Sequence, residues 1–348
     1  MSDTKRATVK DIANELHISI GTVSKALTGK RGISDEMRES IEEAAKRLGY
    51  SVNRQAQCLA RKPIRIGVVY PAAWEEFYGP LIGGMKEAME SLRDYNVFGE
   101  FVHFSGLYST DELSAIMDRM IEEKIDAVIL CPASVTAGGS ILSKLKIHGI
   151  PVFLVGNDFQ KEDRVACVQV DAVMAGRLAG EIMGYLTPPD ASLTAFIGDK
   201  GMMEHLDKVK GFEQEIGGQR KLVSTFETRD DPEIAAYLAR KAIQEIPDIA
   251  GMYIATGNSL AICNVLTELG LNGRIKVIAT DLFDDMKPFI EDRTINAVIY
   301  QYPARLGNAA VTSCYKYLTE RKIPNNTILI EPSPIFRSQL SKNSLLQK

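Results

Sequence analysis

Residues 8–27 read TVKDIANELHISIGTVSKAL, and this stretch carries the signals of two short helices separated by a very tight turn. Thr8, with an acid three residues later at Asp11, has the pattern of a capping box, in which a hydroxyl and a carboxylate satisfy the backbone at a helix start. Ser19 can cap the second helix. Apolar residues at helical spacing continue through residues 34–49, where a third helix is expected. Three short helices spaced in this way predict a helix-turn-helix head, whose second helix can enter the major groove of DNA.

The second of these helices is expected to present a polar face to DNA. Lys25 can donate hydrogen bonds to a guanine edge, and Ile20 can contact a thymine methyl group. Hydroxyl groups and the N-terminus of the helix suit backbone phosphates. A plain three-helix bundle with a polar face is the alternative that the pattern alone leaves open. The head residues expected to contact DNA are Thr8, Ser19, Ile20, Gly21, Thr22, Ser24 and Lys25.

Charge is distributed unevenly along the 348 residues. Residues 1–62 contain 12 Lys and Arg against 8 Asp and Glu, whereas the rest of the chain is acidic and the net charge is −4. A basic head on an acidic body favours a polyanionic partner for the head, although a solvated helical surface carries such charges as well.

Composition and cysteine usage predict a cytoplasmic globular protein without a metal site. The chain is 45% hydrophobic and 25% charged, which is ordinary for a soluble domain, and no apolar run reaches the ~18 residues of a membrane span. The N-terminus lacks the apolar segment of a secretory signal. Five cysteines are scattered without a CxxC pattern or a Cys/His cluster. We therefore expect neither disulfides nor zinc, and no cofactor.

From Ile64 onward, short apolar runs alternate with amphipathic helical segments. Continuous runs rich in Val and Ile, separated by helices, indicate parallel strands that are buried on both faces. The body is therefore predicted to be α/β with doubly wound parallel sheets, and its roughly 280 residues suit two lobes better than one. The runs are IRIGVVY (64–70), DAVILC (126–131), PVFLVG (151–156), LTAFIG (193–198), GMYIAT (251–256), IKVIAT (275–280) and INAVIYQ (295–301).

Ligands of such sheets bind beyond the carboxyl ends of the strands, and the residues there form a consistent chemical set. Aromatic rings can stack on the C–H faces of a polyhydroxylated molecule, and amide and charged groups can pair with its hydroxyls. Any single aromatic residue could instead belong to the core, and a nucleobase could stack on these rings equally well. The predicted effector-binding residues are Trp74, Phe77, Tyr78, Ser134, Asn157, Asp158, Lys208, Thr256, Asn258, Asp281 and Gln301.

A catalytic function is not expected. Residues 257–261, GNSLA, nearly match the G-x-S-x-G motif of a nucleophilic serine between a strand and a helix. In that arrangement a histidine follows the serine along the chain, whereas the last of the four histidines is His205. Neither a Walker A loop nor a GxGxxG motif occurs, and the histidines lack the spacing of metal ligands.

The head resembles the DNA-binding domain of the lactose/galactose repressor (LacI/GalR) family over residues 9–60, without a gap. The resemblance rests on VKDIA, the S-x-x-TVS run, LGY and NRQAQCLA. It implies that Ile20, Gly21 and Lys25 occupy the positions that read bases. Three residues depart from the family, which usually has Arg in place of Lys25, a small residue or Gly in place of His17, and Pro in place of Val52.

The same resemblance implies a hinge helix that orders on DNA and pairs with its dimer mate in the minor groove. Leu59 stands where the family inserts a leucine between base steps, and a flexible linker with Leu59 packed on the body is the alternative. The expected domains are a DNA-binding domain, residues 1–52, a hinge helix and linker, residues 53–63, and an effector-binding and dimerisation domain, residues 64–348. The hinge residues expected on DNA are Asn53, Arg54, Ala56 and Leu59.

The body resembles the type I periplasmic sugar-binding fold, in the form that LacI/GalR regulators carry. Lys208 stands where that family commonly has an arginine that grips the ligand. The matching pieces are VQVDAVMAGRLAG (168–180), KVKGF (208–212), ATGNSLA (255–261) and AVIYQYPARLGNAA (297–310). The resemblance implies two lobes joined by crossovers near residues 160, 292 and 322. Lobe 1 is expected at about 64–160 and 295–321, and lobe 2 at about 161–292 and 322–340.

These features together predict a transcriptional regulator, with repression as the first expectation, that binds pseudo-palindromic double-stranded operator DNA as a homodimer. A small sugar or sugar-like effector between the lobes is expected to control operator affinity. One alternative is the same regulator with a non-sugar effector such as a purine. Another is a solute-binding protein without a regulatory role, and the head argues against it.

Overall fold

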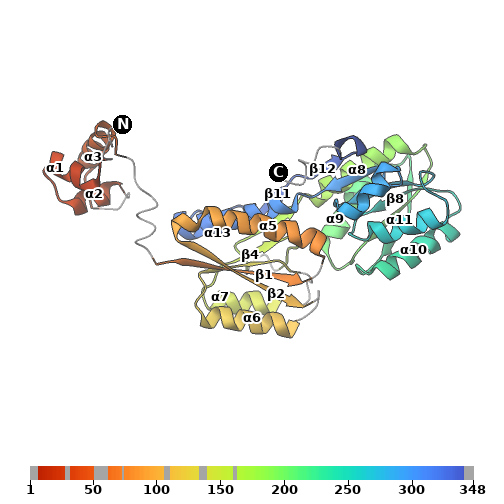
Figure 1. Ribbon diagram of the computed structural model, residues 1–348, viewed down its shortest axis with the longest axis horizontal. Helices are drawn as coiled ribbons and strands as arrows, with labels where there is room; N and C mark the ends of the chain where they lie inside the picture. Colours follow the sequence, from red (N-terminus) through yellow and green to blue (C-terminus); the bar gives the residue numbers. More distant parts are fainter. Residues whose placement is uncertain are drawn as a thin grey trace. The chain divides into compact units, whose positions relative to one another are not determined.

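The computed structural model describes residues 7–27, 32–50, 62–72, 74–105, 110–132, 139–159 and 163–340. These residues form two compact units, a head that ends at Lys62 and a body that begins at Pro63, and each is described by itself (Figure 1). The predicted hinge helix lies outside the described residues, and so does Ser134. The hinge residues concerned are Asn53, Arg54, Ala56 and Leu59.

The head contains the three helices that its capping signals predict. Thr8 caps the first helix, because its Oγ1 accepts the Asp11 N–H at 3.4 Å while its own N–H donates to the Asp11 carboxylate at 2.7 Å. Ser19 Oγ accepts the Thr22 N–H at 3.0 Å at the start of the second helix. The helices are α1 (Val9–Glu15), α2 (Ile20–Leu27) and α3 (Asp35–Arg47).

One apolar cluster holds these three helices together. Ile12 of α1, Val23 of α2 and Ile41 of α3 have no exposed surface, and full burial of such a side chain stabilises a fold by about 1.5–3 kcal/mol. Arg38 of α3 donates to the Ala26 carbonyl at 2.7 Å and so fixes α3 against the end of α2. The head therefore has a hydrophobic core of its own.

The turn between α1 and α2 contains a strained residue. His17 has a φ of 53°, in the left-handed region, where a non-glycine residue costs about 1–2 kcal/mol. Its side chain is exposed, so packing does not offset the strain.

The first sheet of the body is parallel throughout, in the order β11-β5-β4-β3-β1-β2. Its central strands β3 and β4 are buried at every position, which explains their continuous apolar runs. Helices α5 and α13 cover one face, and α6 and α7 cover the other (Figure 1). The elements are β1 (Ile64–Ala72), α5 (Glu75–Ser91), β2 (Val97–Ser105), α6 (Thr110–Glu122), β3 (Ala127–Leu130), α7 (Gly139–Ile147), β4 (Val152–Val155), β5 (Ala166–Val170), α13 (Pro303–Glu320) and β11 (Thr327–Ile330).

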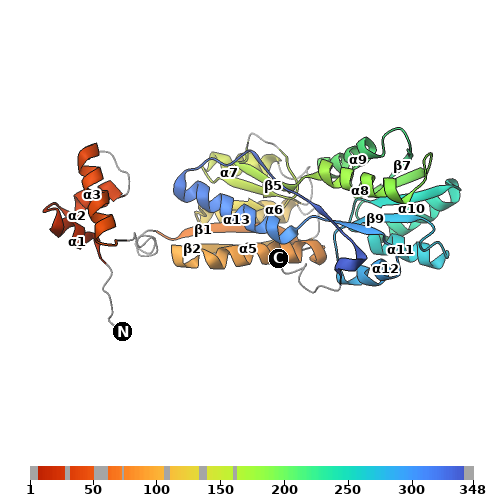
Figure 2. The same ribbon diagram turned by 90° about the horizontal axis from the view of Figure 1, so that it is seen from above.

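The second sheet has the order β12-β10-β9-β8-β6-β7, and only β12 runs antiparallel to its neighbour. Helices α8 and α9 pack on one face, while α10, α11 and α12 pack on the other (Figure 2). The elements are α8 (Ala172–Leu186), β6 (Ser192–Ile197), α9 (Met203–Ile216), β7 (Lys221–Glu227), α10 (Pro232–Glu245), β8 (Ile249–Ile254), α11 (Ser259–Glu268), β9 (Lys276–Thr280), α12 (Lys287–Glu291), β10 (Ala297–Tyr300) and β12 (Ser333–Ile335).

The lobe boundaries differ from the expected ones. Strand β10 pairs with β9 in the second sheet, whereas β11 pairs with β5 in the first. The expected assignment of 295–321 to lobe 1 and of 322–340 to lobe 2 is therefore corrected for these two strands, although α13 does pack on the first sheet. Strand β5 was expected in lobe 2, at about 161–292, but it pairs with β4 in the first sheet, so this boundary is corrected as well. The chain crosses between the sheets near residues 171, 301 and 331. The buried strands of both sheets have the same apolar character, so their pattern does not tell which sheet receives a strand.

Each lobe contains a helix pair that is packed through glycine. Gly176 of α8 lies against the Lys208 carbonyl of α9, and Gly211 of α9 lies against the backbone of α8, so that a Cβ at either position would collide with main chain. Gly84 of α5 and Gly307 of α13 make the same kind of reciprocal contact. The first pair fixes α9 and, with it, the position of Lys208.

Candidate functional site

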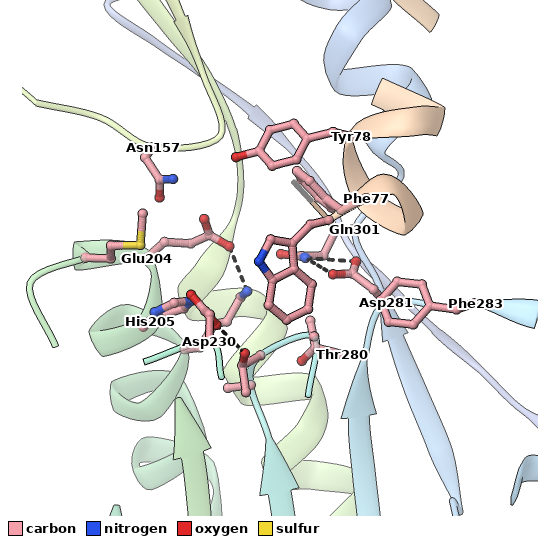
Figure 3. Close-up of a pocket in the computed structure, with 16 residues that line it drawn as sticks. Phe77, Tyr78, Asn157, Glu204, His205, Asp230, Thr280, Asp281, Phe283 and Gln301 are labelled. Atoms are coloured by element: carbon pink, nitrogen blue, oxygen red, sulfur yellow. Dashed lines mark hydrogen bonds and ion pairs between the residues drawn. The ribbon is translucent and has the colours of Figure 1, made fainter. Parts of the chain in front are cut away.

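A pocket lies between the two lobes, at the carboxyl ends of strands from both sheets (Figure 3). Its walls bound about 660 Å³ of empty space, part of which is open solvent. We call it the interlobe pocket. Its lining residues are Trp74, Phe77, Tyr78, Asn157, Met202, Glu204, His205, Lys208, Asp230, Ala255, Thr256, Gly257, Thr280, Asp281, Phe283 and Gln301.

The structure brings most of the predicted effector-binding residues to this pocket. Asp158 and Asn258 are exceptions. The Asp158 carboxylate is held by two bonds of 2.5 and 2.6 Å from the buried Arg164 guanidinium, and Asn258 Nδ2 donates to Thr228 Oγ1 at 3.0 Å. Both side chains are thus used inside the protein. The predicted residues that line the pocket are Trp74, Phe77, Tyr78, Asn157, Lys208, Thr256, Asp281 and Gln301.

Lys208 and Glu204 form an ion pair on one face of α9. Their Nζ and Oε1 atoms lie 2.7 Å apart, and the two side chains are only 3% and 20% exposed. Burial by itself disfavours the charged Lys208, but the Glu204 carboxylate outweighs it and raises the pKa of Lys208. Burial likewise opposes the charged Glu204, and Lys208 lowers the pKa of that carboxyl. The pair is therefore ionised and carries no net charge.

Asp281 and Gln301 form a second polar pair, from the ends of β9 and β10. Gln301 Nε2 donates to both Asp281 carboxylate oxygens at 2.9 Å (Figure 3). Burial raises the pKa of Asp281 to about 6, although Lys208 and the Gln301 hydrogen bond oppose the shift. Gln301 Oε1 is buried and has no hydrogen-bond partner among the residues that the structure describes. A buried acceptor without a donor costs free energy, so this carbonyl marks a place for a ligand donor.

Asp230 follows β7 and is held by Thr256, whose Oγ1 donates to Asp230 Oδ1 at 2.6 Å. Backbone strain gathers at the same strand ends. Trp74, Asp230 and Asp281 have φ values of 52°, 56° and 63°, in the left-handed region. Strained non-glycine residues of this kind concentrate at binding sites, where the surrounding structure holds them in place. Here the strain aims two carboxylates and an indole at the interlobe pocket.

Aromatic rings form the other wall of the pocket. Phe77 and Tyr78, on the first turn of α5, pack edge to face with ring centres 5.4 Å apart. Burial raises the pKa of Tyr78, so its hydroxyl keeps its proton. The Trp74 ring lies directly on the backbone of Gly257, which belongs to the other lobe. The wall therefore offers flat apolar faces opposite the carboxylates, as sugar rings require.

Several lining residues escaped the sequence analysis. Met202, Glu204 and His205 lie at the start of α9, one helical turn before Lys208, and their spacing from Lys208 is the signal that could have revealed them. The others follow strands, and Asp230 was missed because strand β7 itself was not recognised. These residues, at or just after strand ends, are Asp230, Ala255, Gly257, Thr280 and Phe283.

The outer face of α2 is the candidate DNA-binding surface of the head. Ile20 is 53% exposed. An exposed apolar side chain on a helix that can enter the major groove suits contact with a thymine methyl group. Ser24 and Lys25 are exposed as well. A Cβ at Gly21 would meet only Ser19 Oγ, at 3.6 Å, so glycine is not needed there for the fold. The hydroxyls of Thr8 and Ser19 serve as helix caps.

Two kinds of feature are missing from the part of the chain that the structure describes. It contains no group of three or more His, Cys, Asp or Glu side chains able to hold a metal ion. None of its helices combines the length and the apolar character that crossing a bilayer requires. Its cysteines are free thiols, all buried: Cys131, Cys167, Cys263 and Cys314.

Fold and pocket together define a two-part protein, a helix-turn-helix head followed by a two-lobed ligand-binding body. Residues 66–322 match the family model described as periplasmic binding protein domain, and residues 8–53 match the model described as bacterial regulatory proteins, lacI family. The chain belongs to the periplasmic binding protein domain family, and its head carries the domain of the lacI family. The two matches are to regulatory proteins and to a binding-protein domain, which are not enzymes.

The chain is similar in sequence to two staphylococcal proteins named catabolite control protein A. The one from Staphylococcus epidermidis is 25% identical over 203 residues, which are 58% of this chain and 58% of that protein. The one from Staphylococcus xylosus is 24% identical over 196 residues, 55% of each chain. The chain thus spans little more than half the length of these relatives.

Solved structures with the same fold are similar to the body. GanP, a glucose-galactose binding protein from Geobacillus stearothermophilus, superposes with a TM-score of 0.73 at 20% identity, over 80% of this chain and 99% of that one. A solute-binding protein from Bacillus halodurans with bound myo-inositol gives a TM-score of 0.72 at 15% identity, over 82% and 99%. At such identities the likeness defines the fold.

Proposed function

We propose that this protein is a transcriptional repressor whose operator affinity is controlled by a small sugar or sugar-like effector in the interlobe pocket. The observation that carries the proposal is the buried Gln301 carbonyl oxygen. It has no donor among the described residues and lies in a pocket lined by carboxylates and aromatic rings. Hydroxyl groups of a sugar supply such donors, and its C–H faces stack on the rings. The sugar ligands of the structurally similar binding proteins support this choice.

The pocket can couple occupancy to a change of shape because both lobes line it. Trp74 and Tyr78 come from the first lobe, Lys208 and Asp281 come from the second, and Gln301 lies in a crossover between them. A ligand that touches both lobes favours their closed arrangement and so shifts the population toward it. Linkage then requires that DNA alter effector affinity by the same factor as the effector alters DNA affinity.

On the DNA side, the proposal has two heads of a homodimer reading the half-sites of a pseudo-palindromic operator. Residues 53–60 act as the hinge helix, with Leu59 as the wedge in the minor groove, and residues 64–348 bind effector and dimerise. Closure of the lobes changes the order of the paired hinges and releases the operator. The cytoplasm is the proposed place of action, because the operator DNA is there.

The test uses the full-length protein. Duplexes selected from a random pool are labelled, and binding is measured by fluorescence anisotropy against a scrambled duplex at several salt concentrations. We expect a symmetric site that binds at least about 1,000-fold more tightly than the scrambled duplex, and a sugar that weakens this binding. Preference for no duplex, or loss of specific binding with no sugar but with purines, contradicts the proposal.

A further inference from the structure

We infer that the interlobe pocket accepts only effectors without a negative charge, namely unphosphorylated and uncarboxylated sugars or polyols, including amino sugars. This inference rests on the proposed function and narrows its ligand class. Its basis is the balance of charges and of hydrogen-bond donors among the lining residues.

The charge of the lining is negative. Three carboxylates, Glu204, Asp230 and Asp281, face the one Lys or Arg among the described lining residues, which is Lys208. Glu204 already neutralises that ammonium at 2.7 Å. Among the described residues, Asp230 and Asp281 have hydroxyl and amide partners and no ion-pair partner, although the Lys208 charge acts on Asp281 from a distance. An anionic ligand would therefore enter a poorly solvated site against two carboxylates, where Coulomb repulsion is stronger than in water.

The approach to the pocket is also acidic. An adjoining hollow, which shares Phe77, Asp281 and Phe283 with the interlobe pocket, is lined by Glu76, Asp284 and Asp285. Lys287 pairs with Asp284 at 2.6 Å. Walls of one sign repel ligands of that sign and concentrate the opposite one.

The hydrogen-bond donors point to the same ligand class. Asn157 Nδ2 donates to the Pro132 carbonyl at 3.0 Å, Gln301 Nε2 to Asp281, and Thr256 Oγ1 to Asp230. Lys208 donates to Glu204. Each of these groups has a partner inside the protein, whereas the Gln301 carbonyl oxygen has no hydrogen-bond partner among the described residues. A phosphate or carboxylate brings only acceptors, but a hydroxyl or ammonium group brings a donor for this oxygen.

The test is isothermal titration of the full-length protein with matched sets of sugars. One set is D-glucose, D-glucosamine, D-glucuronate and D-glucose 6-phosphate, and the galactose and ribose series are built in the same way. We expect a neutral or amine-bearing member to bind. The affinity of its phosphorylated and carboxylated counterparts is expected to be lower by a factor of roughly 100 or more. A phosphorylated or carboxylated member that binds as tightly as its neutral parent overturns the inference.

Variants separate charge from shape. Glu204→Gln leaves the Lys208 ammonium without its carboxylate partner. The affinity ratio of neutral to anionic members, called the gap below, is therefore expected to fall by about tenfold. Asp230→Asn, which keeps that ion pair, is expected to narrow the gap as well. The control is Glu268→Gln, which removes an exposed ion pair between Glu268 of α11 and Arg240 of α10. It should leave the affinity ratio of neutral to anionic members unchanged. An unchanged gap in both pocket variants overturns the inference.

Failure of the proposed function gives a different result. If no sugar of any charge binds while operator binding persists, the sugar effector itself is refuted, and this inference falls with it. If sugars bind but anionic members are not disfavoured, only the inference is refuted.

Discussion

Alanine at Gly257 is expected to hold the two lobes apart. A Cβ at this position would stand 2.7 Å from Trp74 Cε3 and 3.1 Å from Cη2, and closer still to Cζ3. Carbon atoms in contact lie about 3.5–4.0 Å apart, so the indole must withdraw by about 1 Å or more. The Gly257 backbone lies outside the left-handed region, and alanine is therefore tolerated there in every other respect.

The size of the effect follows from where the collision occurs. Overpacking a close contact costs about 1–3 kcal/mol. Trp74 belongs to the first lobe and Gly257 to the second, so separation of the lobes relieves the collision, and the cost falls on the closed state alone. A penalty on one of two states reduces the affinity of a ligand that prefers that state by roughly 5- to 150-fold. The cores of the two lobes are untouched, and the thermal midpoint of the free protein should change little.

Trp74 is the sole tryptophan of the chain, which makes its fluorescence a direct assay. In Gly257→Ala the emission maximum is expected to move to longer wavelength as the indole becomes wetter, and effector affinity is expected to fall by the stated factor. Gly83→Ala is the matched control, because a Cβ at that position on α5 meets no atom within 4 Å. Wild-type emission and wild-type affinity in Gly257→Ala would refute the idea that the indole bridges closed lobes.

Three further predictions concern the head and the pH response. Lys25→Ala should weaken operator binding by about 1–3 kcal/mol in anisotropy titrations at fixed salt, while Lys46→Ala on α3 leaves it unchanged; equal losses in both contradict base reading by α2. His17→Gly should remove left-handed strain, with a net gain of about 1 kcal/mol after the entropy cost of glycine. Hydrogen exchange of the α1 and α2 amides in the full chain should therefore slow by up to about fivefold. Faster exchange would count against this. Effector affinity should fall below pH 6, by at most about tenfold per pH unit, because Asp281, whose pKa is raised to about 6, must be ionised to accept two donors. The pKa of Asp281 in the folded protein lies above the ordinary value of 3.8. The same carboxyl should therefore make the ligand-free fold less stable as pH rises from about 4 to 6. Calorimetry from pH 4 to 8 checks both trends, and Asp281→Asn should lose them.

Most of the buried strands were predictable from sequence, and the edge strands were not. The exception is β5, an interior strand that is not among the predicted runs. Strands such as β3 and β4 have every residue buried, so their apolar runs are continuous. Strands β2 and β7 lie at the edges of their sheets, with mixed exposure along their length. Polar residues interrupt them, and the pattern of a doubly buried strand is absent.

The same difference explains the pocket. Trp74 and Asp281 follow buried strands and were located by the strand-end rule, whereas Asp230 follows edge strand β7. Asp158 obeys the same rule but pairs with Arg164, which is close in sequence and buried beside it. A rule about positions along the chain does not show which partner a side chain binds in the folded protein. Tertiary packing determines that partner.

The three crossovers restrict how the lobes can move. They are short, with one residue between β5 and α8 and two in each of the other cases, 301–302 and 331–332. Tyr302 and Ser333 also join two of them through a 2.6 Å bond between their hydroxyls. Three short connections of this kind allow the lobes to bend toward each other, but they oppose twisting and sliding of one lobe against the other. Because Gln301 is part of it, a molecule bound there acts at the pivot, and a rotation of a few degrees becomes a displacement that grows with distance along each lobe.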